Sequence, residues 1–456
     1  MKRLLLLALL AAVSASAGPD PLKIDATRFA LKNGLNVVLV EDHSVPRVHM
    51  SLRVRTGSAW EKPGRTGFAH LFEHLMFEGS KNVPEGAFDQ WLEAAGGSNN
   101  AWTSEDFTYY YEEGPSNALD LMMFLESDRL GYFLDKLDKT LIDGQRDVVK
   151  NERRQSYENQ PYGMAELAVP SLLYPKNHPY SWPVIGSMDD LTAAGTDDVR
   201  DFFTSHYAPE NMILVLVGDF QTGAARAAVD KWFSEIPSRG GRPAPAPAPL
   251  QLKGEKRAVF EDDVELPRVS LVWPSAAVFG PDDAALDLLA ATLTGGESSR
   301  LVKRLVHELR VAQSVGASQE SRERGGEFTI EVLAFPGQKL HDITRVVDEE
   351  VARLLREGPT EAELARAKTV NEAHLFDDLD SLSAKADRVS TYAMLLGDPD
   401  SFAKDLARYT KVTREDVAAA GRRTLTRGRL VLSVVPKGHL EQAVINPVLP
   451  MVGGAR

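Results

Sequence analysis

Two histidines and a glutamate near residue 70 have the spacing that metal-assisted hydrolysis requires. His70 and His74 are four residues apart, and Glu73 stands between them. On a helix this spacing places both imidazoles on one surface, one turn apart, where they can bind the same metal ion. Glu73 then lies beside them and is suited to accept the proton of an attacking water molecule. The order His-x-x-Glu-His is the inverted form of a zinc peptidase motif, which predicts a zinc hydrolase.

The segment that carries this motif, residues 66–79, is expected to form a helix with Thr66 as its N-cap and Gly79 at its end. One side of this helix is predicted to pack on a core, because apolar side chains recur there at helical spacing: Phe68, Leu71, Phe72, Leu75 and Met76. The motif occupies the opposite side. A surface helix with two unrelated histidines is the alternative. Histidines buried in the core are less expected, because the apolar stripe faces away from them.

A catalytic zinc ion takes three protein ligands and leaves a fourth position for water, so a third ligand is needed. Glu152 is the candidate, in the charged and helical run 145–154. Taken alone, the charges of this run favour a solvated surface helix. The assignment of Glu152 therefore depends on agreement over the rest of the chain.

The composition excludes several other kinds of site. The 456 residues include no cysteine, which excludes disulfides, thiolate metal ligands and a cysteine nucleophile. The formal net charge of -13 disfavours nucleic acid and anionic membranes as partners. A Gly-Gly-Glu-Phe sequence at 325–328 occurs in cyclic dinucleotide synthases, but the acidic metal pair of such an enzyme is not evident upstream.

The first residues have the form of an export signal. Two basic residues precede an apolar run at 4–13, and Ala15-Ser16-Ala17 matches a signal-peptidase site. We expect a signal peptide at 1–17 and a periplasmic protein, with full secretion as the alternative. The apolar run is about half of the roughly 20 residues that span a bilayer, so no membrane anchor is expected.

The sequence predicts an α+β fold in which one α/β-sandwich domain occurs twice. A Pro/Ala linker at 239–254 separates an N-terminal zinc-binding peptidase domain at 18–238 from a homologous C-terminal domain at 255–448, and a tail follows at 449–456. Both domains open with a Glu-Asp pair and a Pro-Arg-Val sequence before a strand, and both close with a buried strand before a turn. The repeated order indicates an internal duplication.

Besides the motif helix, several further segments of the chain resemble those of a known protein family. They are Asn100–Thr103 with Tyr109 and Tyr110, Arg146–Val149 before Glu152, Asn159–Tyr162, His178–Tyr180 with Ile185 and Gly186, Tyr207–Asn211, and Val217–Asp219. Together with the motif helix, these segments resemble the pitrilysin and insulinase family of inverted-motif zinc peptidases. Within that family they are similar to the half-length branch of the mitochondrial processing peptidase. The likeness covers nearly all of the chain that follows the expected signal peptide.

The resemblance implies a complete zinc site. It makes Glu152 the third ligand beside His70 and His74, so that each chain would hold one Zn2+, with zinc preferred over another divalent ion for this donor set. It makes Glu73 the catalytic residue. Gln145 stands where many relatives carry an acidic residue behind the ligands, and its amide could still orient them.

The resemblance also implies how substrate binds. Asn100, Ala101 and Thr103 would lie on an edge strand to which an extended peptide adds as a further strand. The alternative for this segment is an ordinary turn between a helix and a strand, which the glycines Gly96 and Gly97 fit equally well.

One departure concerns the second domain. Active relatives supply an arginine and a tyrosine from this domain to bind substrate and stabilise the oxyanion. Here Arg310 is present, but Gln313 stands near the position of the tyrosine. Half-length relatives work in pairs that enclose a chamber like two halves of a clam. We therefore expect a heterodimer with a homologous zinc-less subunit that supplies the arginine and tyrosine, and a homodimer is the alternative.

The function predicted from the sequence is that of a zinc-dependent endopeptidase acting on peptides or unfolded polypeptides. The alternative is a non-catalytic structural or binding subunit of the same fold. Such subunits usually have damaged motifs, whereas His70, Glu73, His74 and Glu152 are all in place here.

Overall fold

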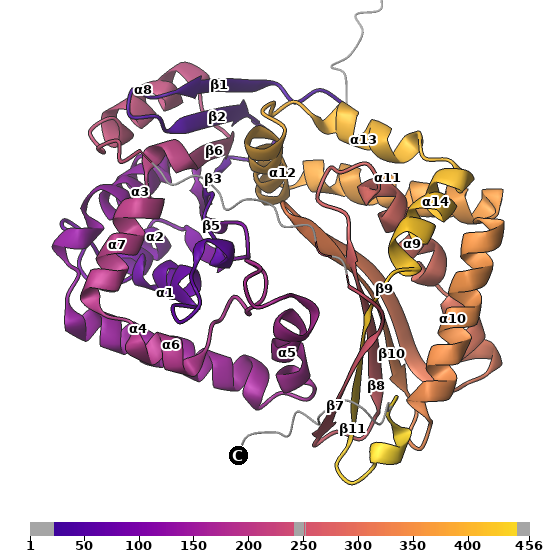
Figure 1. The fold of residues 1–456 in the computed structure, drawn as a ribbon. Helices are drawn as coiled ribbons and strands as arrows, with labels where there is room; N and C mark the ends of the chain where they lie inside the picture. The colour runs from indigo at the N-terminus through magenta and orange to yellow at the C-terminus, as the bar shows by residue number, and fades with distance from the viewer. Residues whose placement is uncertain (1–21, 241–249, 251, 445–456) are drawn as a thin grey trace, which may run out of the picture.

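The protein consists of two α/β halves that lie side by side (Figure 1). The computed structural model describes residues 22–240, 250 and 252–444. The predicted signal peptide at 1–17 and the predicted tail at 449–456 lie outside the described residues, and so does most of the predicted linker.

Each half is built on one sheet. The first has the strand order β1-β2-β6-β3-β5-β4 and the second β7-β11-β8-β10-β9. The strands of the first sheet are β1 (Ala26–Ala30), β2 (Asn36–Glu41), β3 (Arg47–Val54), β4 (Ser98–Thr103), β5 (Thr108–Pro115) and β6 (Met212–Gly218). Those of the second are β7 (Lys256–Asp262), β8 (Arg268–Ser275), β9 (Ala312–Arg322), β10 (Gly325–Ala334) and β11 (Leu430–Pro436).

The two sheets share one topology. β2 pairs in parallel with β6, and β7 pairs in parallel with β11. The next three pairs are antiparallel in both sheets, in the order β6-β3-β5-β4 and β11-β8-β10-β9. The first sheet differs by β1, which adds antiparallel to β2. The predicted α+β fold with two homologous sandwich domains is therefore confirmed, while the residue limits of the domains stay predictions.

Helices cover both sheets (Figure 1). Those of the first half are α1 (Phe68–Leu75), α2 (Ala87–Ala94), α3 (Leu119–Tyr132), α4 (Lys139–Arg153), α5 (Gly163–Leu173), α6 (Met188–Ala193), α7 (Thr196–His206) and α8 (Thr222–Phe233). Those of the second are α9 (Asp283–Thr294), α10 (Leu340–Glu357), α11 (Glu361–Asp380), α12 (Leu382–Leu395), α13 (Phe402–Thr410) and α14 (Arg414–Leu425). None of the helices in the described part of the chain is both long and apolar enough to cross a membrane.

Each half contributes one helix that packs on the sheet of the other half. α12 of the second half packs on β3 and β6 of the first sheet, and α5 of the first half packs on β7 and β11 of the second (Figure 1). Each contact has its own apolar cluster, with Val389 of α12 against Val215 of β6 and Leu173 of α5 against Leu432 of β11. Because each sheet is covered in part by the other half, the halves hold a fixed relationship.

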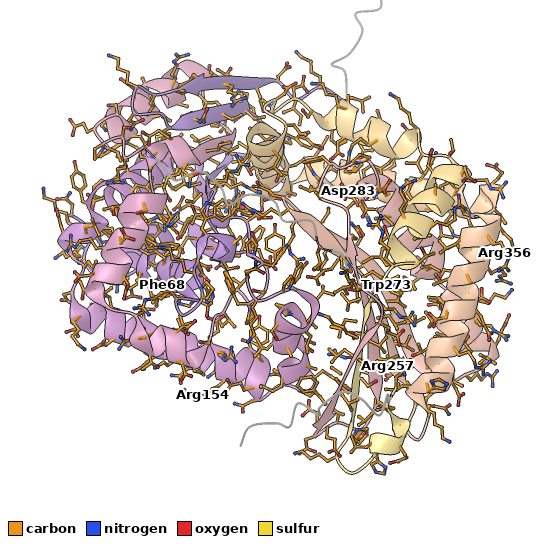
Figure 2. All side chains as sticks on the ribbon, viewed as in Figure 1. Phe68, Arg154, Arg257, Trp273, Asp283 and Arg356 are labelled. Carbon is orange, nitrogen blue, oxygen red and sulfur yellow. The ribbon has the colours of Figure 1, made fainter. Side chains whose placement is uncertain are left out.

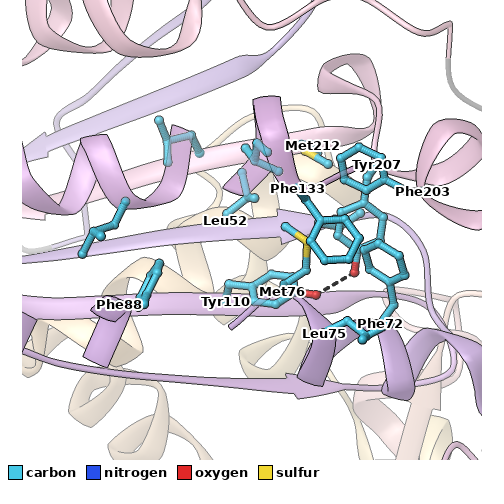
Figure 3. Close-up of a cluster of buried hydrophobic side chains, with 14 of the residues drawn as sticks. Leu52, Phe72, Leu75, Met76, Phe88, Tyr110, Phe133, Phe203, Tyr207 and Met212 are labelled. Atoms are coloured by element: carbon cyan, nitrogen blue, oxygen red, sulfur yellow. Dashed lines mark hydrogen bonds between the residues drawn. The ribbon is translucent and has the colours of Figure 1, made fainter. Parts of the chain in front are cut away.

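The largest core lies beneath α1 (Figure 3). The ring centroid of Phe72 lies 4.5 Å from that of Tyr207 and 5.3 Å from that of Phe133. The hydroxyls of Tyr110 and Tyr207 share a hydrogen bond of 2.7 Å, so neither is buried unsatisfied. Burying one such apolar side chain contributes about 1.5–3 kcal/mol, and this fixes which face of α1 looks inward.

Candidate metal centre and active site

The helix of the zinc motif is shorter than the sequence predicts, and its predicted cap is wrong. α1 spans Phe68–Leu75, and Gly67 precedes it with φ 85°. Thr66 does not cap it, because the Thr66 hydroxyl donates to Asp190 at 2.6 Å and accepts from the Ser187 amide at 3.1 Å. Gly79 lies beyond the end of the helix in a left-handed conformation, φ 99°.

A buried carboxylate that the sequence analysis did not single out caps α1. Glu61 accepts the backbone N–H groups of Gly67 at 3.0 Å and Ala69 at 2.8 Å. An acceptor at a helix N-terminus satisfies amides that have no partner within the helix. Burial raises the pKa of Glu61 to about 8, against these hydrogen bonds. The available signal was an acidic residue shortly before the helix, but it lies outside the usual cap positions.

α1 presents the motif on its accessible side, as the sequence predicts. Phe68, Leu71, Phe72, Leu75 and Met76 are all buried in the core. The His70 side chain is 12% exposed and that of His74 24%, while Glu73 is 9% exposed. Phe68 lies within the first half, and Arg154, just beyond α4, lies in the same half (Figure 2).

α4 brings Glu152 to the two histidines. The Glu152 carboxylate lies 3.6 Å from His70 Nε2 and 3.1 Å from His74 Nε2. One donor atom from each residue lies within 4.8 Å of the others, and no other group of three or more His, Cys, Asp or Glu in the described ranges converges in this way. Two imidazoles and a carboxylate are a donor set that suits zinc.

Several contacts hold α4 in register with α1. Asp138 caps the start of α4 by accepting the Leu141 amide at 2.9 Å. At the other end, Arg153 donates to the Gly186 carbonyl at 2.6 Å. Gly186 in turn packs directly on Gly67, where a Cβ would come within 2.4 Å of the Gly67 Cα. The segment at 186 therefore joins the end of α4 to the start of α1.

The protonation states of His70 and Glu152 fit a cation. Burial lowers the pKa of His70 to about 4, partly opposed by Glu152, so its imidazole is neutral at neutral pH. The hydrogen bond with His74 lowers the pKa of Glu152, and this carboxylate is ionised. Neutral imidazole and ionised carboxylate are the forms that bind a divalent metal.

Glu73 lies beside His70, His74 and Glu152 and is buried from solvent. Burial raises the pKa of Glu73, while a hydrogen bond from the Thr103 hydroxyl opposes that rise. A carboxylate with a raised pKa is a stronger base than one in water, and this is the property that a proton acceptor in hydrolysis needs.

The predicted substrate segment is an edge strand. β4 pairs with β5 on one side and is the last strand of its sheet. Ala101 packs against the core beneath α1, and Thr103 contacts Glu73, so β4 runs directly past the candidate site. Asn100 is exposed, and its side-chain oxygen accepts the Ala101 amide at 2.8 Å.

Within the described ranges, no hydrogen bond or ion pair joins Gln145, Arg310 or Gln313 to the site. Gln145 lies on α4, half-buried, and no hydrogen bond between its amide and the histidines or Glu152 is found in the described part of the chain. Arg310 is exposed, with a left-handed φ of 54°. Gln313 is exposed at an irregularity of the edge strand β9. The predicted roles of these three residues stay predictions.

Two family models match the chain. The model described as insulinase (peptidase family M16) matches residues 36–181, which include β4, α1 and α4. The model described as peptidase M16 inactive domain matches residues 194–371.

Individual proteins agree with these models. The zinc protease PqqE of Helicobacter pylori is 30% identical over 366 residues, which cover 79% of this chain and 82% of that protein. The probable mitochondrial-processing peptidase subunit beta of Arabidopsis thaliana is 22% identical and is covered to 77%, with 89% of this chain. The crystal structure of a protease from Helicobacter pylori matches with a TM-score of 0.85 at 27% identity, over 91% of this chain and 100% of that one. The chain therefore belongs to the insulinase family of peptidases, family M16, as its resemblance to that family predicted.

Proposed function

We propose that this protein is a zinc-dependent endopeptidase that cleaves peptides or unfolded polypeptides. The observation that supports this most directly is the convergence of His70, His74 and Glu152 beside Glu73, at the edge strand β4. The named zinc protease among the relatives agrees with this assignment.

His70, His74 and Glu152 would hold the metal, and Glu73 would move the proton. A bound zinc ion supplies Lewis acidity to the peptide carbonyl and to the attacking water. Glu73 takes the proton from that water and passes it to the departing amine, so the peptide C–N bond breaks while a C–O bond forms. The Thr103 hydroxyl holds one oxygen of Glu73, which leaves the other free for proton transfer.

The peptide would bind as an added strand. β4 has one unpaired edge, so an extended backbone can pair with it and place its carbonyl next to Glu73. Asn100, Ala101 and Thr103 would contact this substrate. An extended binding mode favours short or unfolded chains, because a folded protein does not offer a free strand.

We further propose that the active unit is a dimer. In the described part of the single chain, no hydrogen bond or ion pair joins Arg310 or Gln313 to His70, His74 or Glu152. A second chain would supply the groups that these two residues do not. A homologous zinc-less subunit that supplies an arginine and a tyrosine fits the replacement of the tyrosine by Gln313, and a homodimer is the competing arrangement. Export to the periplasm is part of the same proposal and depends on the signal pattern at 1–17.

The test is hydrolysis of a quenched fluorescent peptide library by the purified chain, with bound metal measured in parallel. Activity that requires zinc and disappears in Glu73→Gln supports the proposal. A protein that retains zinc but cleaves no peptide, alone or with a homologous partner, would instead be the non-catalytic subunit.

A further inference from the structure

A cavity of about 530 Å³ lies at the junction of the two halves, against the end of β4. Trp102 and Phe107 line it from the first half. Gln319 of β9, Asp287 of α9 and Asp387 of α12 line it from the second. The catalytic assignment above makes no use of this cavity.

Trp102 connects the cavity with the predicted substrate strand. Side chains of β4 alternate between two faces, as in any strand. Ala101 and Thr103 face α1, where Ala101 packs on the core and Thr103 contacts Glu73. Trp102 therefore points to the opposite face, where its ring lies 4.7 Å from Phe107 and 5.9 Å from Tyr109. Its side chain is 42% exposed, although it stands at a domain junction.

This placement makes the cavity a side-chain pocket for a peptide on β4. In a sheet, residues that stand opposite each other on neighbouring strands project to the same face. A substrate residue opposite Trp102 would therefore point into the cavity, while its neighbours in sequence point towards Glu73 and the metal ligands. This step rests on the proposed function, since it takes β4 as the substrate strand.

The charge of the lining favours a cation. Six carboxylates and two guanidinium groups line the cavity: Glu105, Asp106, Asp287, Glu320, Glu323 and Asp387 with Arg53 and Arg322. From outside the lining, Arg55 pairs with Glu323 and Arg324 with Asp106. A net negative charge remains even with Asp287 protonated, and the face of an indole attracts a cation as well.

Gln319 is left without a partner in this cavity. Both polar atoms of its amide are buried, and neither has a hydrogen-bond partner among the described residues. A buried amide without partners is costly, and such groups in native proteins usually meet a ligand or water. The side-chain oxygen of Gln319 can accept from an ammonium or guanidinium group.

We propose that this cavity binds a lysine or arginine side chain of the peptide substrate, with Trp102 and Gln319 as its recognition residues. Asp287 adds to this preference. Burial, with the neighbouring Asp283, raises the pKa of Asp287 to about 7, so an arriving cation would favour its ionised form. Selection of a basic side chain would act next to the scissile bond, because Trp102 is adjacent in sequence to Thr103.

The experiment compares N-acetylated fluorogenic peptides that carry lysine, arginine or uncharged norleucine at each position around the cleaved bond. The wild-type protein is expected to prefer the basic residue at one position by about tenfold in kcat/KM, which lies between the effects of an exposed and a desolvated cation–π contact. Trp102→Leu and the isosteric Gln319→Met are each expected to reduce this preference to about threefold or less. Trp91→Leu is the matched control, because Trp91 is a similarly exposed tryptophan on α2 outside the cavity.

Hydrolysis without a basic preference, or a preference that both variants retain, would overturn the pocket and leave the proposed function intact. The same peptides without the acetyl group are the second set. A preference that appears only in this set would overturn the pocket as well, since the cation would then be the α-ammonium group. Calorimetric binding of the same peptides to Glu73→Gln separates the two proposals. Tighter binding of basic peptides there, lost in Trp102→Leu, supports the pocket even if no variant shows hydrolysis.

Discussion

Thr103 of β4 donates its hydroxyl hydrogen bond to Glu73 of α1. This contact joins the edge strand, on which a peptide would lie, to the carboxylate that would take the proton. In the proposed function, this interaction would keep the base next to the strand that binds the substrate. The predictions below test the parts of this arrangement separately.

Glu73→Gln is expected to keep the metal and lose hydrolysis. The amide preserves the shape of the side chain and can still contact Thr103, but it cannot accept a proton. The loss in kcat should be about 10²–10⁴-fold, the usual contribution of a general base. Metal content and peptide hydrolysis are measured on the same sample. Retained activity would show that another group takes the proton.

His70→Ala and Glu152→Ala are expected to lose the metal itself. Each removes one of three converging donors, and two remaining donors hold zinc weakly. Metal analysis after dialysis checks this outcome, with Asp147→Ala as a control, because Asp147 is an exposed residue on the same helix as Glu152. Full zinc retention in Glu152→Ala would mean that the third ligand lies elsewhere.

Glu61→Ala is expected to destabilise the helix that carries both histidines. It leaves the amides of Gly67 and Ala69 without their acceptor, which costs about 1–2 kcal/mol in free energy of unfolding. Denaturant unfolding measures the loss. Glu61→Gln is the control, because its remaining oxygen can cap one amide and should recover part of the stability. Equal stability of Glu61→Ala and wild type would contradict the capping role.

The contact between α12 and the first sheet is expected to weaken in acid. Burial alone would raise the pKa of Asp42, but hydrogen bonds from Lys385 of α12 and from Ser44 outweigh it and lower it to about 2. Because the folded pKa lies below the usual value near 3.8, this stabilisation is present above pH 4 and disappears as the pH falls towards 2.

The amount should be about 1 kcal/mol, since the pair is partly open to solvent and screened. Unfolding measured between pH 2 and pH 5 would show it as an acid-dependent loss of stability that is larger in wild type than in Lys385→Met. Wild type and Lys385→Met falling in parallel over this range would show that the Asp42–Lys385 pair contributes nothing.

The sequence by itself determined the motif helix and its orientation. The four-residue histidine spacing and the apolar stripe of Phe68, Phe72 and Leu75 are local properties, and α1 buries these residues as helical periodicity requires. The duplication of the strand order could also be predicted from the sequence, because both halves repeat the same succession of strands and turns. The bounds of α1 were less accurate, since helix ends depend on partners distant in sequence.

Only the tertiary structure decided what lies around these elements. The pattern of β3 predicts one solvated face, yet His49, Ser51 and Arg53 are buried on it, because α12 from the other half covers that side. Glu61 became a cap only when the turn before α1 folded back on the helix. The convergence of Glu152 with His70 depends on the packing of α4 against α1, and spacing along one helix cannot encode a contact between two.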